Sequence, residues 1–240
     1  MTKLYRELAS WWPLLSSVDD YAGEADFFRQ MLVDTGLPSA PSLLELGCGG
    51  GSNAFYLKKI FSQVTLTDIS PEMLAVSRAL NPDCEHAAGD MRTLRLGRAF
   101  DIVFIHDAID YMTTSGDLAG AIETAFVHCK PGGLVLIVPD YVRETFHPDT
   151  DHGGHDSTDR SLRYLEWTYD PDPQDTMYTT EYVYLLREGL QPTRVEYDRH
   201  LCGLFPRAEW MESLHAAGGE PQIVHDPYDR DVFLARKHQA

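Results

Sequence analysis

A run of glycines at residues 47–51 is the part of this sequence most suited to bind a ligand. The short apolar stretch 42–46 is predicted to be a buried strand. Gly47-Cys48-Gly49-Gly50-Gly51-Ser52 follows it directly, and a helical pattern with apolar residues at 54, 55, 57 and 60 comes next. A strand that enters a glycine loop and then a helix presents bare backbone N–H groups to a ligand. The loop is therefore predicted to hold a ligand rather than to form a simple tight turn.

An acidic residue follows at the place where a ribose-binding carboxylate is expected. Asp68 ends a second predicted strand at 64–68, 21 positions after Gly47. A carboxylate there accepts hydrogen bonds from both ribose hydroxyls, whereas Ser70 suits the N-cap of the next helix better. The ligand is thus predicted to carry adenosine. A dinucleotide motif needs glycine or alanine where this chain has Ser52, while S-adenosylmethionine has no phosphate and accepts a looser loop, so both classes stay open on these residues.

Three more polar side chains are predicted at the carboxyl edge of the sheet. His106 follows a predicted strand at 101–105, and Asp140 and Tyr141 follow another at 134–138. Ligands bind at this edge in open α/β sheets. His106 is a candidate general base for an amine or hydroxyl acceptor, or else a side chain that only shapes the pocket. Asp140 and Tyr141 are expected to face the acceptor.

Histidines and aspartates gather in a polar loop at 140–160 that is expected to be irregular. A metal site made of His152, His155 and Asp156 is conceivable. Such loops are more often solvated or turned toward a substrate. His152 and His155 are therefore predicted to contact the substrate, and no metal is predicted.

The first 140 residues alternate between helical and strand patterns. Residues 1–38 are predicted to be helical and to cover the cofactor through aromatic side chains, unless these only pack in the core. Short unbroken apolar strands between helices favour a parallel sheet that is covered on both faces. The aromatic residues are Tyr5, Trp11, Trp12 and Tyr21, and the strands are predicted at 42–46, 64–68, 84–88, 101–105 and 134–138.

After residue 140 the periodicity changes to two. An antiparallel meander is predicted as an insertion on the sheet, and its tyrosines suit a face that packs on the substrate pocket or on a second copy of the chain. A homodimer through the meander is therefore an expectation. The meander strands are predicted at 162–169, 177–187 and 193–201, followed by a helix from Pro206 and two closing strands near 222–225 and 231–236.

Composition narrows the function classes. The 240 residues carry a net charge of -17, which repels phosphate backbones and anionic lipid, so neither nucleic acid nor a membrane is an expected partner. The four cysteines form no CxxC pair and are predicted to be free thiols in a reducing cytoplasm. One domain is predicted, with a helical lid at 1–38, a cofactor half at 40–140, an insertion at 141–203 and a closing unit at 204–240.

Five segments in order resemble class I S-adenosylmethionine-dependent methyltransferases. The first holds the glycine loop, the second the acidic ribose ligand, and the third the acidic turn that reads adenine. The last two resemble the fourth strand and the turn before the fifth strand. The segments are LELGCGGG at 44–51, LTDISPEML at 66–74, GDM at 89–91, FDIV at 100–103 and KPGGL at 130–134.

This resemblance implies a Rossmann-like sheet of seven mostly parallel strands in the order 3-2-1-4-5-7-6. It also implies S-adenosylmethionine as the cofactor. The glycines approach its methionine part, Asp68 takes the ribose, Met73 packs beside the adenine, Asp90 and the Met91 N–H bind the adenine edge, and the backbone at 106 meets the methionine part. The implied cofactor-binding set is Tyr21, Glu45, Gly47, Gly49, Gly51, Asp68, Ile69, Met73, Asp90, Met91 and His106.

A narrower resemblance is to amino-sugar N-methyltransferases, carried by NPD at 81–83, GDMR at 89–92, LGRAFD at 96–101 and GLFPR at 203–207. The predicted function is methyl transfer from S-adenosylmethionine to a nitrogen or oxygen of a small polar molecule, such as an amino sugar or another secondary metabolite. His106 and Tyr141 are the predicted catalytic residues, and Asp140, Tyr141, His152 and His155 are the predicted substrate contacts. The alternatives are an NAD-type oxidoreductase and a non-catalytic adenosyl-cofactor-binding protein.

Overall fold

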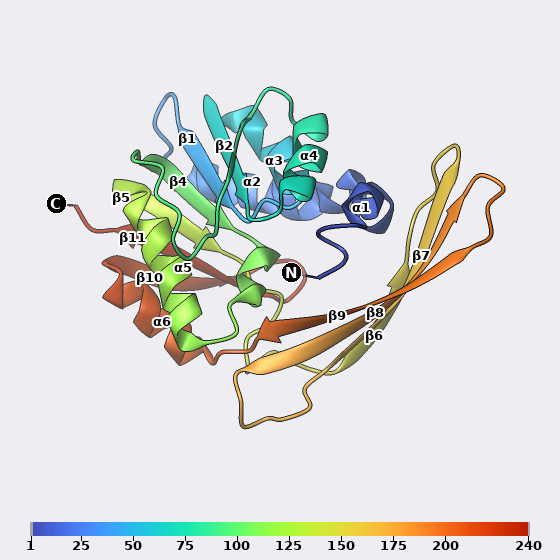
Figure 1. The fold of residues 1–240 in the computed structure, drawn as a ribbon. Coiled ribbons are helices and arrows are strands. Elements are labelled where there is room, and N and C mark those ends of the chain that lie inside the picture. The colour runs from blue at the N-terminus through green and yellow to red at the C-terminus, as the bar shows by residue number, and fades with distance from the viewer. Residues whose placement is uncertain (1, 240) are drawn as a thin grey trace.

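The computed structural model describes residues 2–239 and contains two sheets (Figure 1). The larger sheet has seven strands in the order β10-β11-β5-β4-β1-β2-β3, and only the β11 contacts to β5 and β10 are antiparallel. The predicted order 3-2-1-4-5-7-6 is confirmed. Its strands are β1 Ser42–Leu46, β2 Gln63–Asp68, β3 Glu85–Ala88, β4 Phe100–Ile105, β5 Cys129–Ile137, β10 Gly219–His225 and β11 Asp231–Lys237.

Helices cover both faces of this sheet, as predicted. On one face α5 (Ser115–Val127) and α6 (Arg207–Ala216) pack against Val103 and Ile105 of β4. On the other face Ile102 and Phe104 pack in a cluster with the three helices α2 (Ala22–Asp34), α3 (Ser52–Leu57) and α4 (Pro71–Leu80). Alternate side chains of one strand thus enter two cores, which explains its unbroken apolar sequence. The shorter helices are η1 Ala9–Trp11, α1 Trp12–Leu15, η2 Val18–Tyr21, η3 Lys58–Ile60 and η4 Asp107–Tyr111.

The fifth strand begins earlier than predicted. β5 already pairs with β4 at Cys129, opposite Phe100, and its next partners are Leu134 and Ile102. The segment 130–133, predicted as a turn, lies inside β5 as an irregularity between these two pairs. Glycine and proline in this segment indicated a turn, but pairing on both sides of the irregularity extends the strand.

The predicted antiparallel insertion after the fifth strand is confirmed, and between residues 149 and 203 it forms a four-stranded sheet of its own. Its order is β6-β7-β8-β9, and its inner face packs on Leu4, Leu8 and Trp11 of the N-terminal segment. Figure 1 shows it as a curved arm beside the helices of the N-terminal segment. The strands are β6 Asp149–Gly153, β7 Arg160–Tyr169, β8 Met177–Glu188 and β9 Arg194–Gly203.

The strand β6 was expected to be irregular. Its sequence is Asp-Thr-Asp-His-Gly, and its residues are mostly exposed. It carries no hydrophobic alternation, so only the backbone ladder to β7 makes it a strand. An edge strand of polar residues gives no periodic signal in the sequence.

The two faces of the smaller sheet differ in exposure. On β8 the side chains of Tyr178, Thr180 and Tyr184 are buried on the inner face, whereas Val183 and Leu185 point outward and are exposed. Tyr184 packs on the N-terminal segment, and Tyr178 packs with Cys202 and Leu204. The two-residue periodicity of the sequence therefore separated the buried face of β8 from its exposed face. Together with β7 and β9, this outer face exposes Leu165, Trp167, Val183, Leu185, Val195, Tyr197 and Leu201.

All four cysteines are free thiols, as predicted. Between residues 2 and 239, no helix combines the length and the apolar character that a membrane crossing requires.

Candidate active site

The glycine loop leaves β1 in a conformation that only glycine adopts without strain. Gly47 and Gly49 have φ angles of 73° and 52°. A Cβ atom on Gly47 would lie 2.4 Å from the Cβ of Ala108, so the loop also packs closely against the segment after β4. At Gly49 the nearest atom to a Cβ would be Met73 Cε, at 3.7 Å. The packing around Gly47 fixes the loop, while Gly49 has room for the backbone to approach a ligand.

Asp68 ends β2 directly beside this loop. Its carboxylate accepts hydrogen bonds from the Gly49 N–H at 2.9 Å and the Ser70 N–H at 2.8 Å. Burial raises the pKa of Asp68, and the backbone donors counteract that shift. Ser70 is the N-cap of α4, as predicted, because its Oγ accepts the Met73 N–H at 3.0 Å. The carboxylate is thus held in place at the end of the strand.

A cleft of about 880 Å³ opens over the loop and continues toward the inner face of the smaller sheet. It brings together most of the predicted site residues with side chains that the sequence analysis did not select, among them Asp110, Glu166 and Tyr178. The predicted residues that line it are Tyr21, Glu45, Gly47, Gly49, Asp68, Ile69, Asp90, Met91, His106, Asp140 and Tyr141.

Four predicted site residues lie outside this cleft. Met73 is fully buried beneath Gly49, and Gly51 packs on Ser77 of α4, so both support the loop from below. His152 is exposed on the edge strand β6, and the His155 imidazole lies 3.1 Å from Asp20 Oδ2, toward the N-terminal segment. The predicted substrate contacts of His152 and His155 are therefore not supported by their positions.

The N-terminal segment reaches the cleft through part of the predicted aromatic lid. Tyr5, Trp12 and Tyr21 line the cleft, whereas Trp11 packs in the cluster with the smaller sheet. The Tyr111 hydroxyl donates to the Tyr5 oxygen at 2.8 Å. Ser70 Oγ donates to the Tyr5 carbonyl at 2.5 Å, which joins this segment to the cofactor half.

His106 is enclosed by two carboxylates. Its Nδ1 lies 2.8 Å from Asp107 Oδ1 and its Nε2 lies 3.3 Å from Glu24 Oε1. Burial alone would lower the pKa of His106, but Asp107 and Glu24 outweigh it and raise the pKa to about 10. The ring is then an imidazolium at neutral pH, with both nitrogens protonated. It has no lone pair for a substrate proton, so the structure does not favour His106 as a general base.

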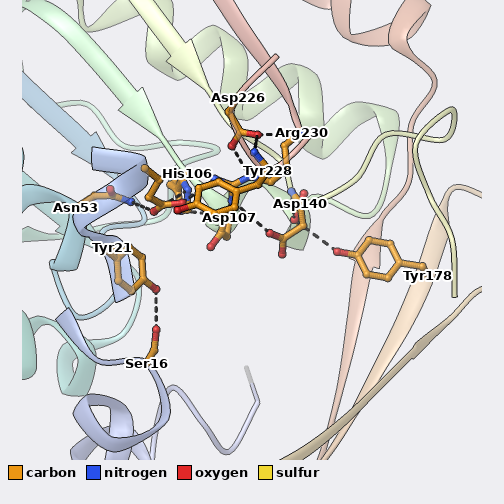
Figure 2. A network of polar contacts seen from close by, with 12 residues as sticks. Ser16, Tyr21, Asn53, His106, Asp107, Asp140, Tyr178, Asp226, Tyr228 and Arg230 are labelled. Atoms are coloured by element: carbon orange, nitrogen blue, oxygen red, sulfur yellow. Dashed lines mark hydrogen bonds and ion pairs between the residues drawn. The ribbon is translucent and has the colours of Figure 1, made fainter. Parts of the chain in front are cut away.

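A network of ion pairs between side chains extends from His106 to the turn between β10 and β11 (Figure 2). Arg230 Nη2 lies 2.6 Å from Glu24 Oε2, and its Nε lies 2.8 Å from Asp226 Oδ2. Although burial opposes the shift, His106 and Arg230 lower the pKa of Glu24 to about 2. Asn53 donates to Glu24 at 3.0 Å. This network fixes α2, α3 and the turn around the floor of the cleft.

A second polar group lies between this network and the smaller sheet. The Asp140 N–H donates to Asp110 Oδ2 at 2.9 Å, and the Tyr178 hydroxyl lies 3.5 Å from the same oxygen. Burial and the neighbouring carboxylates raise the pKa of both aspartates. Asp110 follows β4 by five residues, and Tyr178 is an inward residue of β8. Asp110 could have been predicted from its place after a strand, and Tyr178 from the two-residue periodicity of β8. Neither residue belongs to a known motif.

Comparisons with known proteins agree with this geometry. A family described as a methyltransferase domain matches residues 43–133. The dTDP-3-amino-3,4,6-trideoxy-alpha-D-glucopyranose N,N-dimethyltransferase of Streptomyces venezuelae is 30% identical over 220 residues, which cover 90% of each chain. This chain belongs to the S-adenosylmethionine-dependent methyltransferases.

Solved structures show the same similarity for this methyltransferase. Streptomyces venezuelae DesVI superposes with a TM-score of 0.81 at 28% identity over 92% of each chain. SAM-bound CalS10, an amino pentose methyltransferase from Micromonospora echinaspora, superposes with a TM-score of 0.77 at 25% identity, over 89% of this chain and 90% of that one. The comparisons support S-adenosylmethionine as the cofactor and give no support to the oxidoreductase or the non-catalytic alternative.

The residues of the methyltransferase fit this cofactor. Glu45 Oε2 is buried at the floor of the cleft and has no hydrogen-bond partner among residues 2–239. Burial raises the pKa of Glu45 to about 8. An ammonium group is a suitable donor for such an oxygen, and the methionine part of the cofactor carries one. Asp68 offers a desolvated carboxylate for the ribose, and the positive φ of Gly49 lets the backbone come close.

Proposed function

We propose that this methyltransferase transfers a methyl group to the amino nitrogen of an amino sugar. The relative from Streptomyces venezuelae, named as an N,N-dimethyltransferase of a dTDP-linked amino sugar, carries the proposal because it matches this chain over 90% of both lengths. The cleft adds support, since its acceptor side holds the carboxyl groups of Asp110, Asp140 and Glu166. Carboxyl groups at the reacting position favour an amine there over a hydroxyl or a carboxylate.

On the cofactor side, Asp68 binds the ribose hydroxyls and Glu45 binds the methionine ammonium in this proposal. The N–H groups of the glycine loop face the methionine part. Asp90 and Met91 lie at the adenine edge, where Arg92 holds the Asp90 carboxylate by ion pairs as short as 2.6 Å. S-adenosylmethionine supplies an activated methyl group when it is bound. The protein's task is to align the acceptor and exclude water.

On the acceptor side, Tyr141 is a hydrogen-bond donor for a sugar hydroxyl. Burial and the charges of Asp140 and Asp149 raise its pKa to about 12, so the phenol keeps its proton. The ring packs edge-on against Tyr178 and Phe146, which fixes its direction. We assign Tyr141 a positioning contact with the acceptor rather than a proton-transfer step.

The test is methyl transfer to matched acceptors, followed by mass spectrometry. The pair is dTDP-3-amino-3,6-dideoxyglucose and dTDP-6-deoxyglucose, which differ only in the group at carbon 3. Addition of one or two methyl groups to the amine alone supports the proposal. Methylation of the hydroxyl sugar, or no transfer to the amine by a protein that binds S-adenosylhomocysteine, contradicts it.

The outer face of the smaller sheet is proposed as a homodimer interface. Seven apolar side chains are exposed there, including Trp167 with 53% of its surface. Contiguous apolar patches of this kind mark interaction sites, whereas scattered exposed residues do not. Two such faces can stack as sheets do in a sandwich. Light scattering should show that the native protein is a dimer and that the Trp167→Glu variant is a monomer. A monomeric native protein would contradict the proposed interface.

We infer a single catalytic unit in the cytoplasm, with small molecules as ligands. The free thiols of all four cysteines support a reducing compartment. The net charge of -17 disfavours binding to nucleic acid or to an anionic membrane.

A further inference from the structure

We propose that Asp110 and Asp140 form the site that binds the acceptor amine as an ammonium ion, and that Asp140 takes the proton this amine must lose. This inference rests on the proposed amine methylation and names the residues that make it possible. Asp140 is the proposed catalytic residue, and Asp110 is a positioning residue.

The two aspartates come from neighbouring strands. Asp110 lies in η4 after β4 and Asp140 follows β5, so both lie at the carboxyl edge of the sheet. The Asp140 N–H donates to Asp110 Oδ2 at 2.9 Å, and the Tyr178 hydroxyl approaches that oxygen at 3.5 Å. Figure 2 shows Tyr178 pointing toward this group from the side of the smaller sheet. The carboxyl group of Asp110 is thus fixed from two elements.

The other oxygen of Asp110 lacks a partner. Asp110 is 3% exposed, and its Oδ1 has no hydrogen bond from any group in residues 2–239. A buried carboxyl oxygen without a donor is costly unless a ligand or water supplies one. Asp140, in contrast, is open to the cleft, with 46% of its side chain exposed. Burial and the contact between the two carboxyl groups raise the pKa of Asp110, so a proton shared by the pair supplies the missing donor until a ligand takes its place. Asp140 can be reached by both ligand and solvent.

The surrounding charges favour a cation at this place. Arg230 lies 4.0 Å from Asp140 Oδ1, but its shorter ion pairs are with Glu24 and Asp226. His106 is likewise held by Asp107 and Glu24. Carboxyl groups outnumber cationic groups around the two aspartates, so a bound ammonium ion offsets the net negative charge there. The titratable and charged groups around the pair are Glu24, Glu166, His106, Asp107, Asp149, Tyr141, Tyr178, Tyr182, Cys202, Asp226 and Arg230.

The chemistry of amine methylation uses such a pair. An alkyl ammonium has no free electron pair, so it must lose a proton before it reacts. The N–H bond breaks with its electron pair left on nitrogen, and the proton passes to the Asp140 carboxylate. The nitrogen then forms a bond to the methyl carbon as the carbon–sulfur bond breaks, and the electron pair of that bond stays on sulfur. Asp140 returns its proton to water at the open side of the cleft.

Positive charge moves from sulfur to nitrogen in this reaction. Relative to the neutral amine, a carboxylate beside the nitrogen stabilises this developing charge, and Asp140 is a carboxylate again once its proton has passed to water. The product is again an ammonium ion that bears a proton, so the same step prepares the nitrogen for a second methyl group. The cleft walls desolvate Asp140 although one side of it faces solvent, and this desolvation together with the charge of Asp107 raises its pKa, which suits a proton acceptor near neutral pH.

The experiment compares Asp140→Asn and Asp110→Asn with the native protein and with Asp34→Asn, an exposed change on α2. The acceptor is dTDP-3-amino-3,6-dideoxyglucose, and each protein is first titrated with S-adenosylhomocysteine. All four should bind that ligand within about twofold, which shows that the fold and the cofactor half are intact. Calorimetry with S-adenosylhomocysteine present then measures affinity for the amine and for dTDP-6-deoxyglucose.

We expect the native protein and Asp34→Asn to prefer the amine at least tenfold, and both cleft variants to lose that preference. Asp140→Asn should lower kcat/KM at pH 7 by about 10²-fold and remove the acidic inflection of its pH profile between pH 5 and 9. Native amine preference and a native pH profile in both variants overturn the inference while methyl transfer to the amine still stands. Absence of amine methylation by the native protein refutes the proposed function and this inference together.

Discussion

The charge state of His106 gives the most quantitative test of the site. In the folded protein its pKa is about 10, because Asp107 and Glu24 enclose the ring, while an unfolded histidine titrates near pH 6.5. The side chain is 8% exposed, so solvent screens these contacts little. His106→Gln keeps a polar side chain of similar size and removes the ionisation. It therefore removes the His106 proton and, with it, the charge that lowers the pKa of Glu24, Glu45 and Asp140.

Proton linkage gives the direction in which the stability contributed by His106 changes with pH. Below pH 6.5 both the folded and the unfolded chain hold the proton, and the full stabilisation by His106 is present. Between pH 6.5 and 10 only the folded state holds it, so this stabilisation is lost as the pH rises. One proton corresponds to about 1.4 kcal/mol per pH unit. The advantage of the native protein over His106→Gln should fall by about 2–3 kcal/mol between pH 7 and pH 9.

The assay is urea unfolding of both proteins at pH 7, 8 and 9 and constant ionic strength. The difference between the two free energies of unfolding cancels the shared groups that lie away from His106. The charge of His106 also lowers the pKa of Glu45 and of Asp140, so the pH dependence measured is that of His106 together with these two carboxyl groups. His215→Gln changes an exposed histidine of α6 and controls for the loss of an imidazole. A difference that stays constant within about 0.5 kcal/mol from pH 7 to pH 9 would refute the imidazolium and restore His106 as a candidate base.

Three further predictions concern the cofactor half and its support. Asp68→Ala should weaken binding of S-adenosylhomocysteine at least about tenfold in calorimetry, because hydrogen bonds to a charged group contribute about 1.5–3 kcal/mol; unchanged affinity in a folded variant removes Asp68 from the site. Gly49→Val should abolish that binding while circular dichroism stays native, since the φ of 52° does not suit a β-branched residue; normal binding contradicts the loop's role. Arg230→Met leaves Asp226 buried without its cation and Glu24 with His106 alone, which costs about 3–5 kcal/mol, so the melting temperature should fall by at least about 6 °C. A smaller fall means that the network does not hold the turn.

The cofactor half could be predicted from the sequence because its determinants are local. The glycine loop after an apolar strand, Asp68 at the end of the next strand and the N-cap at Ser70 each depend on a few neighbouring residues. The resemblance also implied that Met73 packs beside the adenine. The structure places Met73 beneath the glycine loop, where it is buried by packing. Local patterns thus identify the loop but not which of its neighbours face the cleft.

The acceptor side could not be predicted in the same way because its contacts join distant segments. Asp110 and Tyr178 are 68 positions apart and meet only because the smaller sheet folds over the carboxyl edge. His106 was expected to be a possible base, and its state depends on Glu24, a residue of α2 that no motif marks. His152 and His155 lie in a segment rich in histidine and aspartate, which suggested a site. Backbone pairing places His152 on the edge strand β6, and His155 contacts Asp20.

A crystal structure with S-adenosylhomocysteine and the amino sugar tests the central claim most directly. The proposal predicts that the ribose hydroxyls lie on Asp68 and that the sugar nitrogen lies between the sulfur and the carboxyl group of Asp140, within hydrogen-bond distance of Asp140. It also predicts that the sugar packs against Tyr141 on the inner face of the smaller sheet. An acceptor bound with its amine away from Asp140, or an adenosyl group bound away from the glycine loop, would contradict the account.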